Sequence, residues 1–138
     1  MSDAPVGAVL DASALLAYLQ GEPGSDLVEV ALAAGAVISA VNYAEVLSRL
    51  GDAGAEPAAV HRRLREHGLI SSLVEVLPLT EDDAVVIAQL RAPTRAQGLS
   101  LGDRACLATG LRLGRPVLTA DRTWAGLSAG VTVRLIRP

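Results

Sequence analysis

The sequence contains no lysine and no phenylalanine, and it has one cysteine. All twelve basic residues are arginine, so every mechanism that needs a lysine amine is excluded. Aromatic residues make up only 2%, so a core must be built from alanine, valine, leucine and isoleucine. The single cysteine, Cys106, cannot form an internal disulfide, so a reducing cytoplasm is the simplest setting for the protein. We expect Cys106 to be a small core residue.

The sequence also lacks a long apolar run and an excess of positive charge. Its longest uncharged run, residues 30–44, is interrupted by Gly35, Ser39 and Asn42 and is too short to span a bilayer. No basic residue precedes the first apolar run, so the start of the chain does not resemble a signal peptide. We expect a soluble, cytoplasmic protein. A net charge of −3 excludes a broadly cationic nucleic-acid-binding protein, so contact with phosphate needs a local arginine cluster or a metal ion.

The pattern of the remaining residues predicts one α/β domain, residues 1–138, with 51% hydrophobic residues for its core. Short apolar runs predict strands at 6–10, 36–39, 74–79, 116–119 and 131–136. Helices are expected between them, from residue 14 and over about 27–34, 41–50, 57–67, 81–90 and 104–113. Such alternation is typical of a parallel sheet covered by helices on both faces. Pro78 places the third strand at an edge, and the alternating pattern of the last strand does the same.

Polar residues precede several of these helices and are predicted to cap them. The expected caps are Ser13 for the first helix, Ser25 or Asp26 for the second, Thr80 for the fifth, and Ser100 with Asp103 for the sixth.

Four acidic residues fall where this topology brings side chains to one edge of the sheet. Asp11 follows the first strand and Asp121 the fourth, Asp103 lies in the first turn of the helix before it, and Glu45 follows the second strand by less than two turns. Ligands of open α/β sheets bind at this carboxyl edge. Four converging acids repel one another unless protons or a cation neutralise them. Oxygen ligands alone favour Mg²⁺ or Mn²⁺, which suit phosphate chemistry.

Each acid also has a purely structural explanation. Asp11 could join Ser13 in capping a helix, Asp103 could complete a capping box with Ser100, Glu45 could pair with Arg49, and Asp121 could be an ordinary loop residue. The metal hypothesis therefore depends on the coincidence of the four acids.

Four segments resemble the motifs of PIN-domain ribonucleases and, more narrowly, of the toxins of VapBC-type toxin–antitoxin pairs. They are LDASA at 10–14, SAVNYAEV at 39–46, LSLGDRACLA at 99–108 and LTADRTW at 118–124. The resemblance covers nearly the whole chain in the family's order. It implies a five-stranded parallel sheet, Mg²⁺ or Mn²⁺ as cofactor, cleavage of single-stranded or looped RNA, an antitoxin that blocks the site, and a homodimer.

The resemblance also assigns roles to individual residues. It places the catalytic, metal-binding acids at Asp11, Glu45, Asp103 and Asp121. It places small polar residues beside the site, which we expect to bind substrate, at Ser13 and Thr119. Arg104 and Arg122 each follow a proposed metal ligand, so we expect them to meet substrate phosphate or to balance the acids. The expected reaction is in-line attack by a metal-activated water, which leaves a 5′-phosphate and a 3′-hydroxyl.

Two other functions remain open from the sequence. Aspartyl-phosphate chemistry, as in receiver domains and haloacid-dehalogenase-like phosphatases, would use Asp11, but such sites need a lysine and a second acid where Ala12 or Ser13 stands. A non-catalytic module that binds metal and a partner is also compatible. The basic run 60–67 could hold RNA phosphates or form a solvated helix face. A mean hydropathy of +0.39 predicts an apolar groove covered by a helix of the antitoxin.

Overall fold

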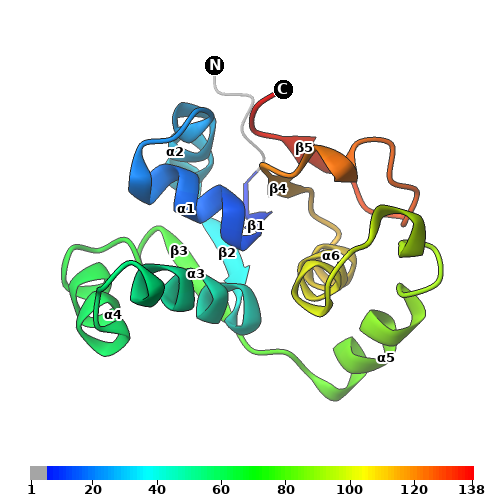
Figure 1. Ribbon diagram of the computed structural model, residues 1–138, viewed down its shortest axis with the longest axis horizontal. Helices are drawn as coiled ribbons and strands as arrows, with labels where there is room; N and C mark the ends of the chain where they lie inside the picture. The colour runs from blue at the N-terminus through cyan, green and yellow to red at the C-terminus, as the bar shows by residue number, and fades with distance from the viewer. Residues whose placement is uncertain (1–5) are drawn as a thin grey trace.

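Five parallel strands form one sheet in the computed structural model, which describes residues 6–138 (Figure 1). Their order across the sheet is β3-β2-β1-β4-β5, and every neighbouring pair is parallel. The strands are β1 (Ala8–Leu10), β2 (Ala36–Ser39), β3 (Val74–Leu77), β4 (Val117–Thr119) and β5 (Val133–Leu135). The predicted α/β fold is confirmed, and β3 and β5 lie at the edges as expected.

Helices connect these strands. They are α1 (Ala12–Gln20), α2 (Ser25–Ala33), α3 (Ala40–Asp52), α4 (Pro57–Glu66), α5 (Glu81–Gln89) and α6 (Leu101–Leu113), with short 3₁₀ helices η1 (Arg95–Gln97) and η2 (Arg122–Trp124). Between residues 6 and 138, none of the helices has the length and apolar character that a membrane crossing requires.

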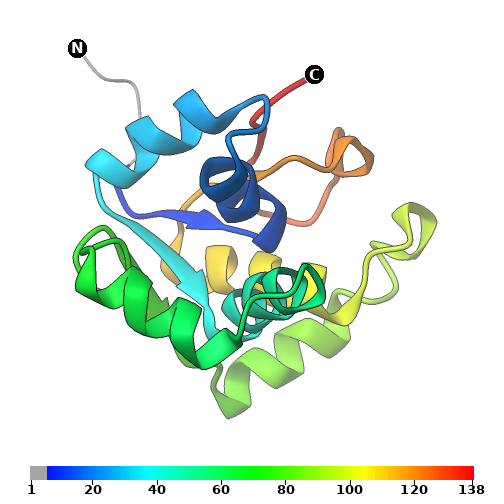
Figure 2. The ribbon, with the colours of Figure 1, turned by 60° about the vertical axis from the view of Figure 1, so that its left-hand side comes forward.

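The alternation of side chains along the strands divides the core in two. Leu10 and Ile38 face one cluster with residues of α1, α2 and α3, whereas Val9, Val37 and Val117 face a second cluster with α5 and α6. Figures 1 and 2 show α1 and α2 on one side of the sheet and α6 on the other. Both faces of β1 are therefore buried, which explains why its sequence is apolar without interruption.

Several boundaries differ from the predictions for identifiable reasons. The first strand begins at Ala8 and not at residue 6, because Gly7 has a φ of +74°, which is not an extended conformation. Pro5, which precedes the predicted strand, lies outside the described residues. The first helix is capped by Asp11 and not by Ser13. The second begins after Gly24, whose φ is +96° and which offers no side-chain cap, so the predicted caps of α2 were wrong.

Two capping boxes match their predictions. Thr80 and Asp83 cap α5, and Ser100 and Asp103 cap α6. The latter helix begins at Leu101, three residues earlier than predicted, because Asp103 occupies the third position of its first turn.

Candidate active site

Asp11 lies at the carboxyl end of β1, where it also caps α1. It is only 4% exposed, yet both of its oxygens accept hydrogen bonds. Oδ1 accepts from Ser13 Oγ at 2.7 Å and from the backbone N–H of Ala14 at 2.8 Å, and Oδ2 accepts from Thr119 Oγ1 at 2.5 Å. The structural explanation of Asp11 as a helix cap is thus confirmed, but a cap does not need a third donor from the far end of the chain.

The surroundings of Asp11 disfavour its charged form. Burial raises the pKa of Asp11 from its ordinary value of 3.8 to about 6. Hydrogen bonds from Thr119, Ser13 and Ala14 oppose this rise, and the negative charge of Asp103 adds to it. A buried carboxylate that is this costly to ionise gains more than an exposed one from a nearby cation.

Ser13 and Thr119 fix the first helix to the end of β4. Ser13 Oγ accepts the backbone N–H of Ala120 at 2.9 Å, and Thr119 Oγ1 accepts that of Asp121 at 3.0 Å. The chain runs from β1 outward through β2 and β3 and returns to place β4 on the other side of β1. The end of β1 beside β4 is therefore the topological switch point of the sheet, which is where ligands of such folds bind.

Glu45 is held in place by a neighbour on the same helix. Asn42 Nδ2 donates to Glu45 Oε1 at 2.8 Å, and also to the backbone oxygen of Gly102 at 2.9 Å. The side-chain oxygen of Asn42 accepts from Ser39 Oγ at 2.6 Å. Asn42 therefore joins the end of β2, the acid on α3 and the start of α6. Among the described residues Glu45 forms no ion pair with Arg49, so that alternative was wrong.

The first turn of α6 brings Asp103 to the same region. A Cβ atom on Gly102 would lie 2.5 Å from Glu45 Oε1, so the Glu45 carboxylate occupies the space that a side chain there would fill. Asp103 follows directly, and its Oδ2 accepts the backbone N–H of Ser100 at 2.9 Å. The capping role of Asp103 is confirmed and engages one of its two oxygens.

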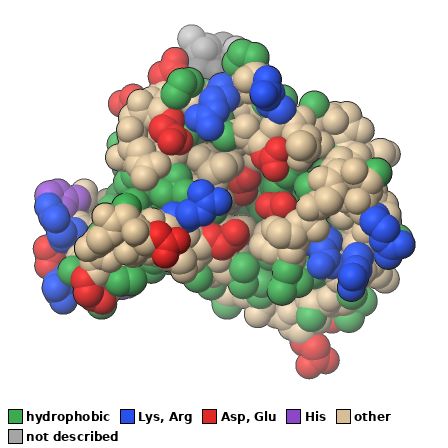
Figure 3. All heavy atoms as spheres, viewed as in Figure 1, with side chains coloured by type: hydrophobic (Ala, Val, Ile, Leu, Met, Phe, Trp, Pro, Cys, Tyr) green, Lys and Arg blue, Asp and Glu red, His purple; other side chains and the backbone are tan. Residues whose placement is uncertain are grey.

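Three of the four predicted acids lie close enough to influence one buried group. Burial raises the pKa of the Cys106 thiol well above its usual value, and the charges of Asp11, Asp103 and Glu45 raise it further. Asp121 is not among these influences; its Oδ1 accepts from the backbone N–H and the hydroxyl of Thr123 and caps η2. Figure 3 shows acidic side chains around a hollow in the middle of this face.

The arrangement is less compact than a set of direct metal ligands. Between residues 6 and 138, no three aspartate, glutamate, histidine or cysteine side chains are close enough together to bind one ion directly. The donor chemistry nevertheless fits Mg²⁺ or Mn²⁺, because these cations prefer oxygen and Mg²⁺ usually keeps several waters while binding one or two carboxylates. The missing side chain at Gly102 leaves the Glu45 carboxylate room beside α6. Asp11, Glu45 and Asp103 are the residues that would hold such an ion, with at least one of them acting through a bound water.

The predicted arginine contacts divide. Arg104 Nη1 donates to the backbone oxygen of Ile87 at 2.9 Å, so its guanidinium is directed at the end of α5, and this geometry gives no support to a phosphate contact. Arg122 is exposed on η2 beside Asp121. Ser13 and Thr119, which we also assigned to substrate, are engaged with Asp11.

Two residues of this region were missed at the level of sequence. Asn42 lies one helical turn before Glu45, a spacing at which side chains on a helix meet, so its contact could have been found. Gly102 carries no comparable signal, because its role depends on a glutamate 57 positions earlier in the chain.

Comparisons with known proteins bear on the family and the fold. The model of the PIN domain matches residues 8–129. Among solved structures, FitAcB from Neisseria gonorrhoeae is 25% identical with a TM-score of 0.66, covering 91% of this chain and 95% of that one. A toxin–antitoxin complex from Klebsiella pneumoniae is 22% identical with a TM-score of 0.67, covering 94% and 98%.

VapC20 from Mycobacterium tuberculosis, described as a toxin that cleaves the sarcin–ricin loop, is 18% identical with a TM-score of 0.67, covering 89% and 98%. The two likenesses below 25% identity show a shared fold. No curated protein sequence matches. The match to the family model covers most of the chain and includes Asp11, Glu45, Asp103 and Asp121, and the chain belongs to the PIN domain family.

Proposed function

We propose that this protein is a metal-dependent endoribonuclease and the toxin of a toxin–antitoxin pair. The observation that carries the proposal is the buried carboxylate of Asp11, which is held by Thr119 at the switch point of the sheet. Glu45 and Asp103 reach the same region from α3 and α6. Membership of the PIN domain family and the toxins among similar structures support the same activity.

The side chains around the acids have distinct tasks in this proposal. A divalent cation held by Asp11, Glu45 and Asp103 would supply the Lewis acid for phosphodiester hydrolysis, with Asp121 as the fourth proposed ligand. Thr119 and Ser13 fix the orientation of Asp11, and Asn42 fixes that of Glu45. Because these positions are set by hydrogen bonds before substrate arrives, the site needs little reorganisation during the reaction.

The proposed substrate is single-stranded or looped RNA. A net charge of −3 gives no general attraction to nucleic acid, so RNA has to be held locally. Arg122, exposed next to Asp121, is the arginine we propose for phosphate contact, and Arg104 is withdrawn because it is committed to α5. VapC20, described as a toxin that cleaves the sarcin–ricin loop, supports this class of substrate.

The proposed partner is an antitoxin that covers an apolar recess beside the site. Figure 3 shows hydrophobic side chains in the recess between α1 and the α3–α4 pair. Partly buried hydrophobic residues on these helices are Tyr18, Leu19, Leu47, Leu50 and Leu64. We propose that a helix of the antitoxin packs there and directs a basic side chain at the acids, and that the toxin is a homodimer. Purification from the native operon should yield a second small protein; a toxin that is always alone and fully active would remove the antitoxin from the proposal and leave the nuclease.

The decisive experiment compares wild type with Asp11→Asn. RNA ends are sequenced after a short pulse of expression, and ends with a 5′-phosphate should accumulate only with wild type. Asp82→Asn is the matched control, because Asp82 is an exposed acid in the first turn of α5 and should leave cleavage unchanged. Full cleavage by a folded Asp11→Asn protein in Mg²⁺ would show that Asp11 is not a catalytic residue. Release of phosphate from a small phosphomonoester in place of RNA cleavage would favour aspartyl-phosphate chemistry.

A further inference from the structure

The charges of the chain are divided unequally along its length. Residues 1–83 contain four arginines and thirteen acidic residues, a net charge of −9, whereas residues 84–138 contain eight arginines and two acidic residues, a net charge of +6. These two acids are Asp103 and Asp121, which we assign to the metal site. The net charge of −3 thus conceals a strongly basic part. Such an asymmetry indicates a surface for a polyanion such as nucleic acid.

The basic part also forms one side of the molecule. Hydrophobic residues of α5, α6, β4, β5 and the segment between these two strands make up most of the second core cluster. In Figure 1 the elements from α5 onward lie to the right of the helices α1 to α4. Figure 3, viewed from the same direction, shows arginine side chains gathered over α6 and the segment that precedes it, on one side of the hollow with the acids.

Two arginines of this side are free to bind a ligand. The arginines that already contact the protein are Arg104, Arg112, Arg115 and Arg137. By contrast, Arg91 and Arg95 are exposed, and their side chains form no hydrogen bond or ion pair with any residue between 6 and 138. The sequence has no acidic residue between Asp83 and Asp103, so no counter-charge lies near them along the chain.

The backbone that carries Arg91 and Arg95 is fixed. Thr94, which is 1% exposed, donates its hydroxyl to the backbone oxygen of Leu90 at 2.7 Å and its N–H to the same oxygen at 3.2 Å. Leu90 is also buried, so these two residues hold the turn against the core. Arg91 and Arg95 each follow one of them and lie about one helical turn apart. The two charges are therefore presented on a turn that needs little ordering when a ligand binds.

This segment leads directly to an acid of the proposed active site. Arg95 precedes Ser100, the cap of α6, by five residues, which span at most about 18 Å even when fully extended. The backbone N–H of Ser100 donates to Asp103 Oδ2 at 2.9 Å. A few nucleotides of an RNA strand cover such a distance.

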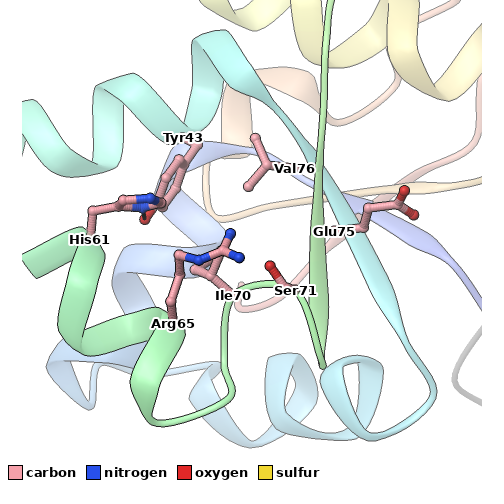
Figure 4. A pocket seen from close by; sticks show the side chains of 7 residues that line it. All are labelled: Tyr43, His61, Arg65, Ile70, Ser71, Glu75 and Val76. Atoms are coloured by element: carbon pink, nitrogen blue, oxygen red, sulfur yellow. Dashed lines mark hydrogen bonds between the residues drawn. The ribbon is translucent and has the colours of Figure 1, made fainter.

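The run of arginines on α4 does not form a comparable surface. Residues 56–75 contain three arginines and three glutamates, so their net charge is zero. Arg65 and Glu75 line the same recess between α3, α4 and β3 (Figure 4). Because acids are interspersed with these arginines, a phosphate backbone is less favoured there than at residues 84–102, which include no acid.

We propose that Arg91 and Arg95 hold the phosphates of the RNA strand on one side of the cleaved bond. Arginine binds phosphate oxygens through two parallel N–H groups, and contacts of this kind position a strand without reading its sequence. This role rests on the proposed function, because it assumes that the acids cut RNA. It also places the substrate strand on the side of the molecule opposite the recess between α1 and the α3–α4 pair, where we place the antitoxin (Figure 1).

The first measurement is RNA binding without cleavage. A fluorescent RNA of about twelve nucleotides and random sequence is titrated with the full Asp11→Asn chain in chelator, and anisotropy is recorded. Adding Arg91→Gln and Arg95→Gln should weaken binding at least tenfold at about 50 mM salt. The slope of log K against log salt should fall by about 1.4, because each phosphate contact of a single strand contributes about 0.7.

The matched control is Arg62→Gln/Arg63→Gln. These two arginines are exposed on α4, and their replacement removes the same charge from the chain. The control should bind RNA as tightly as its parent, and both double variants should keep the melting temperature of the parent. An equal loss of binding in the control would show that net charge governs binding, and absence of binding by the parent at millimolar concentration would contradict the proposal as well. If a polyglutamate of equal charge binds as tightly as RNA and depends equally on Arg91 and Arg95, the surface belongs to an acidic protein.

The second measurement is cleavage in Mg²⁺ by the chain with Asp11 intact. Arg91→Gln/Arg95→Gln should raise KM about tenfold and leave kcat unchanged, because contacts remote from the cleaved bond are equal in the ground state and the transition state. A lowered kcat with an unchanged KM would place these arginines in the reaction step and overturn the proposed role. If wild type cuts RNA and the double variant binds and cuts it equally well, the role is refuted and the nuclease stands. If RNA binding depends on Arg91 and Arg95 in a protein that cuts no RNA, the nuclease is refuted and the binding surface stands.

Discussion

Glu45 Oε1 lies 2.5 Å from the point where a Cβ atom on Gly102 would stand. This contact joins two helices whose sequences are more than fifty residues apart, and it leaves no room for any side chain at position 102. The glutamate cannot swing freely to make room, because Asn42 donates a hydrogen bond to the same oxygen.

Gly102→Ala should therefore reduce cleavage at least tenfold with little loss of stability. Alanine is favoured over glycine within a helix by up to about 1 kcal/mol, which offsets the cost of displacing the Glu45 carboxylate from its hydrogen bond with Asn42. Cleavage rate and melting temperature are measured together. In a Glu45→Ala background, where the obstructing carboxylate is gone, the same substitution should have no further effect on cleavage; an equal further loss would mean that Gly102 acts through something else.

The buried carboxyl of Asp11 should make the metal-free protein more stable as the pH falls. The pKa of Asp11 is raised from 3.8 to about 6 in the folded protein, which corresponds to a penalty of about 3 kcal/mol when the group is ionised in both states. This penalty is fully present above pH 6 and disappears as the pH falls from 6 to 4, because the folded protein binds the proton first. The measurement is urea unfolding in chelator between pH 4 and 8.

Asp11→Asn should flatten this part of the pH profile and be more stable than wild type at pH 8. Wild type and variant that follow the same profile would show that Asp11 does not carry the effect.

Asp103→Asn separates the capping role of Asp103 from its proposed metal role. Asparagine can still accept the hydrogen bond from Ser100, so the loss of capping should lie at the low end of the usual ~0.5–2 kcal/mol. Removal of the charge also relieves repulsion with Asp11, so the variant should be neutral or slightly stabilised in chelator. In Mg²⁺ at ten times its dissociation constant, wild type should gain about 1.4 kcal/mol that the variant lacks. The measurement is a pair of melting curves for each protein, with and without Mg²⁺. If Mg²⁺ stabilises the variant as much as wild type, Asp103 acts only as a helix cap.

The ion pair between Asp83 and Arg112 should contribute more to the stability of the fold than an ion pair on the surface does. Asp83 is 2% exposed; its Oδ1 accepts from Arg112 Nε at 3.0 Å and its Oδ2 from the backbone N–H of Thr80 at 2.8 Å. Arg112→Ala leaves a buried carboxylate without its counter-charge and should cost about 2 kcal/mol. The double variant Asp83→Asn/Arg112→Ala should recover part of that loss, as measured by chemical unfolding. A double variant that is less stable than Arg112→Ala would show that Asp83 stabilises the protein mainly through the capping box of α5.

The positions of the strands were accessible from sequence because each is a short apolar run bounded by turn residues. Asp11 could be placed at the ligand-binding edge for the same reason, since it directly follows the first run. Predicted boundaries failed where a glycine set the backbone, as at Gly7 and Gly24, because a positive φ leaves no trace in hydrophobic periodicity. The cap of α1 is Asp11 and not the predicted Ser13, so this helix begins two residues earlier than predicted, while the site residues stay the same.

Contacts between distant segments were not accessible. Asn42 meets Gly102 across 60 positions, and Asp83, which sequence shows only as one of three acids at a helix start, meets Arg112 across 29. Arg104 illustrates the converse error, because its neighbour in sequence is a site residue but its guanidinium crosses to α5. Periodicity defines which face of an element is buried, but not which other element covers it.

The hydrogen bond from Thr119 to Asp11 spans 108 positions. The site therefore cannot form during synthesis until Thr119 has been added to the chain. A ribosome that has synthesised the first hundred residues has produced Asp11 and Glu45, but neither Asp103 nor Thr119 nor the strand β4 that lies beside β1. At that stage β1 is an open edge, and the buried position of Asp11 does not yet exist. The proposed nuclease site is therefore not assembled until the last segments of the chain have emerged from the exit tunnel and folded back.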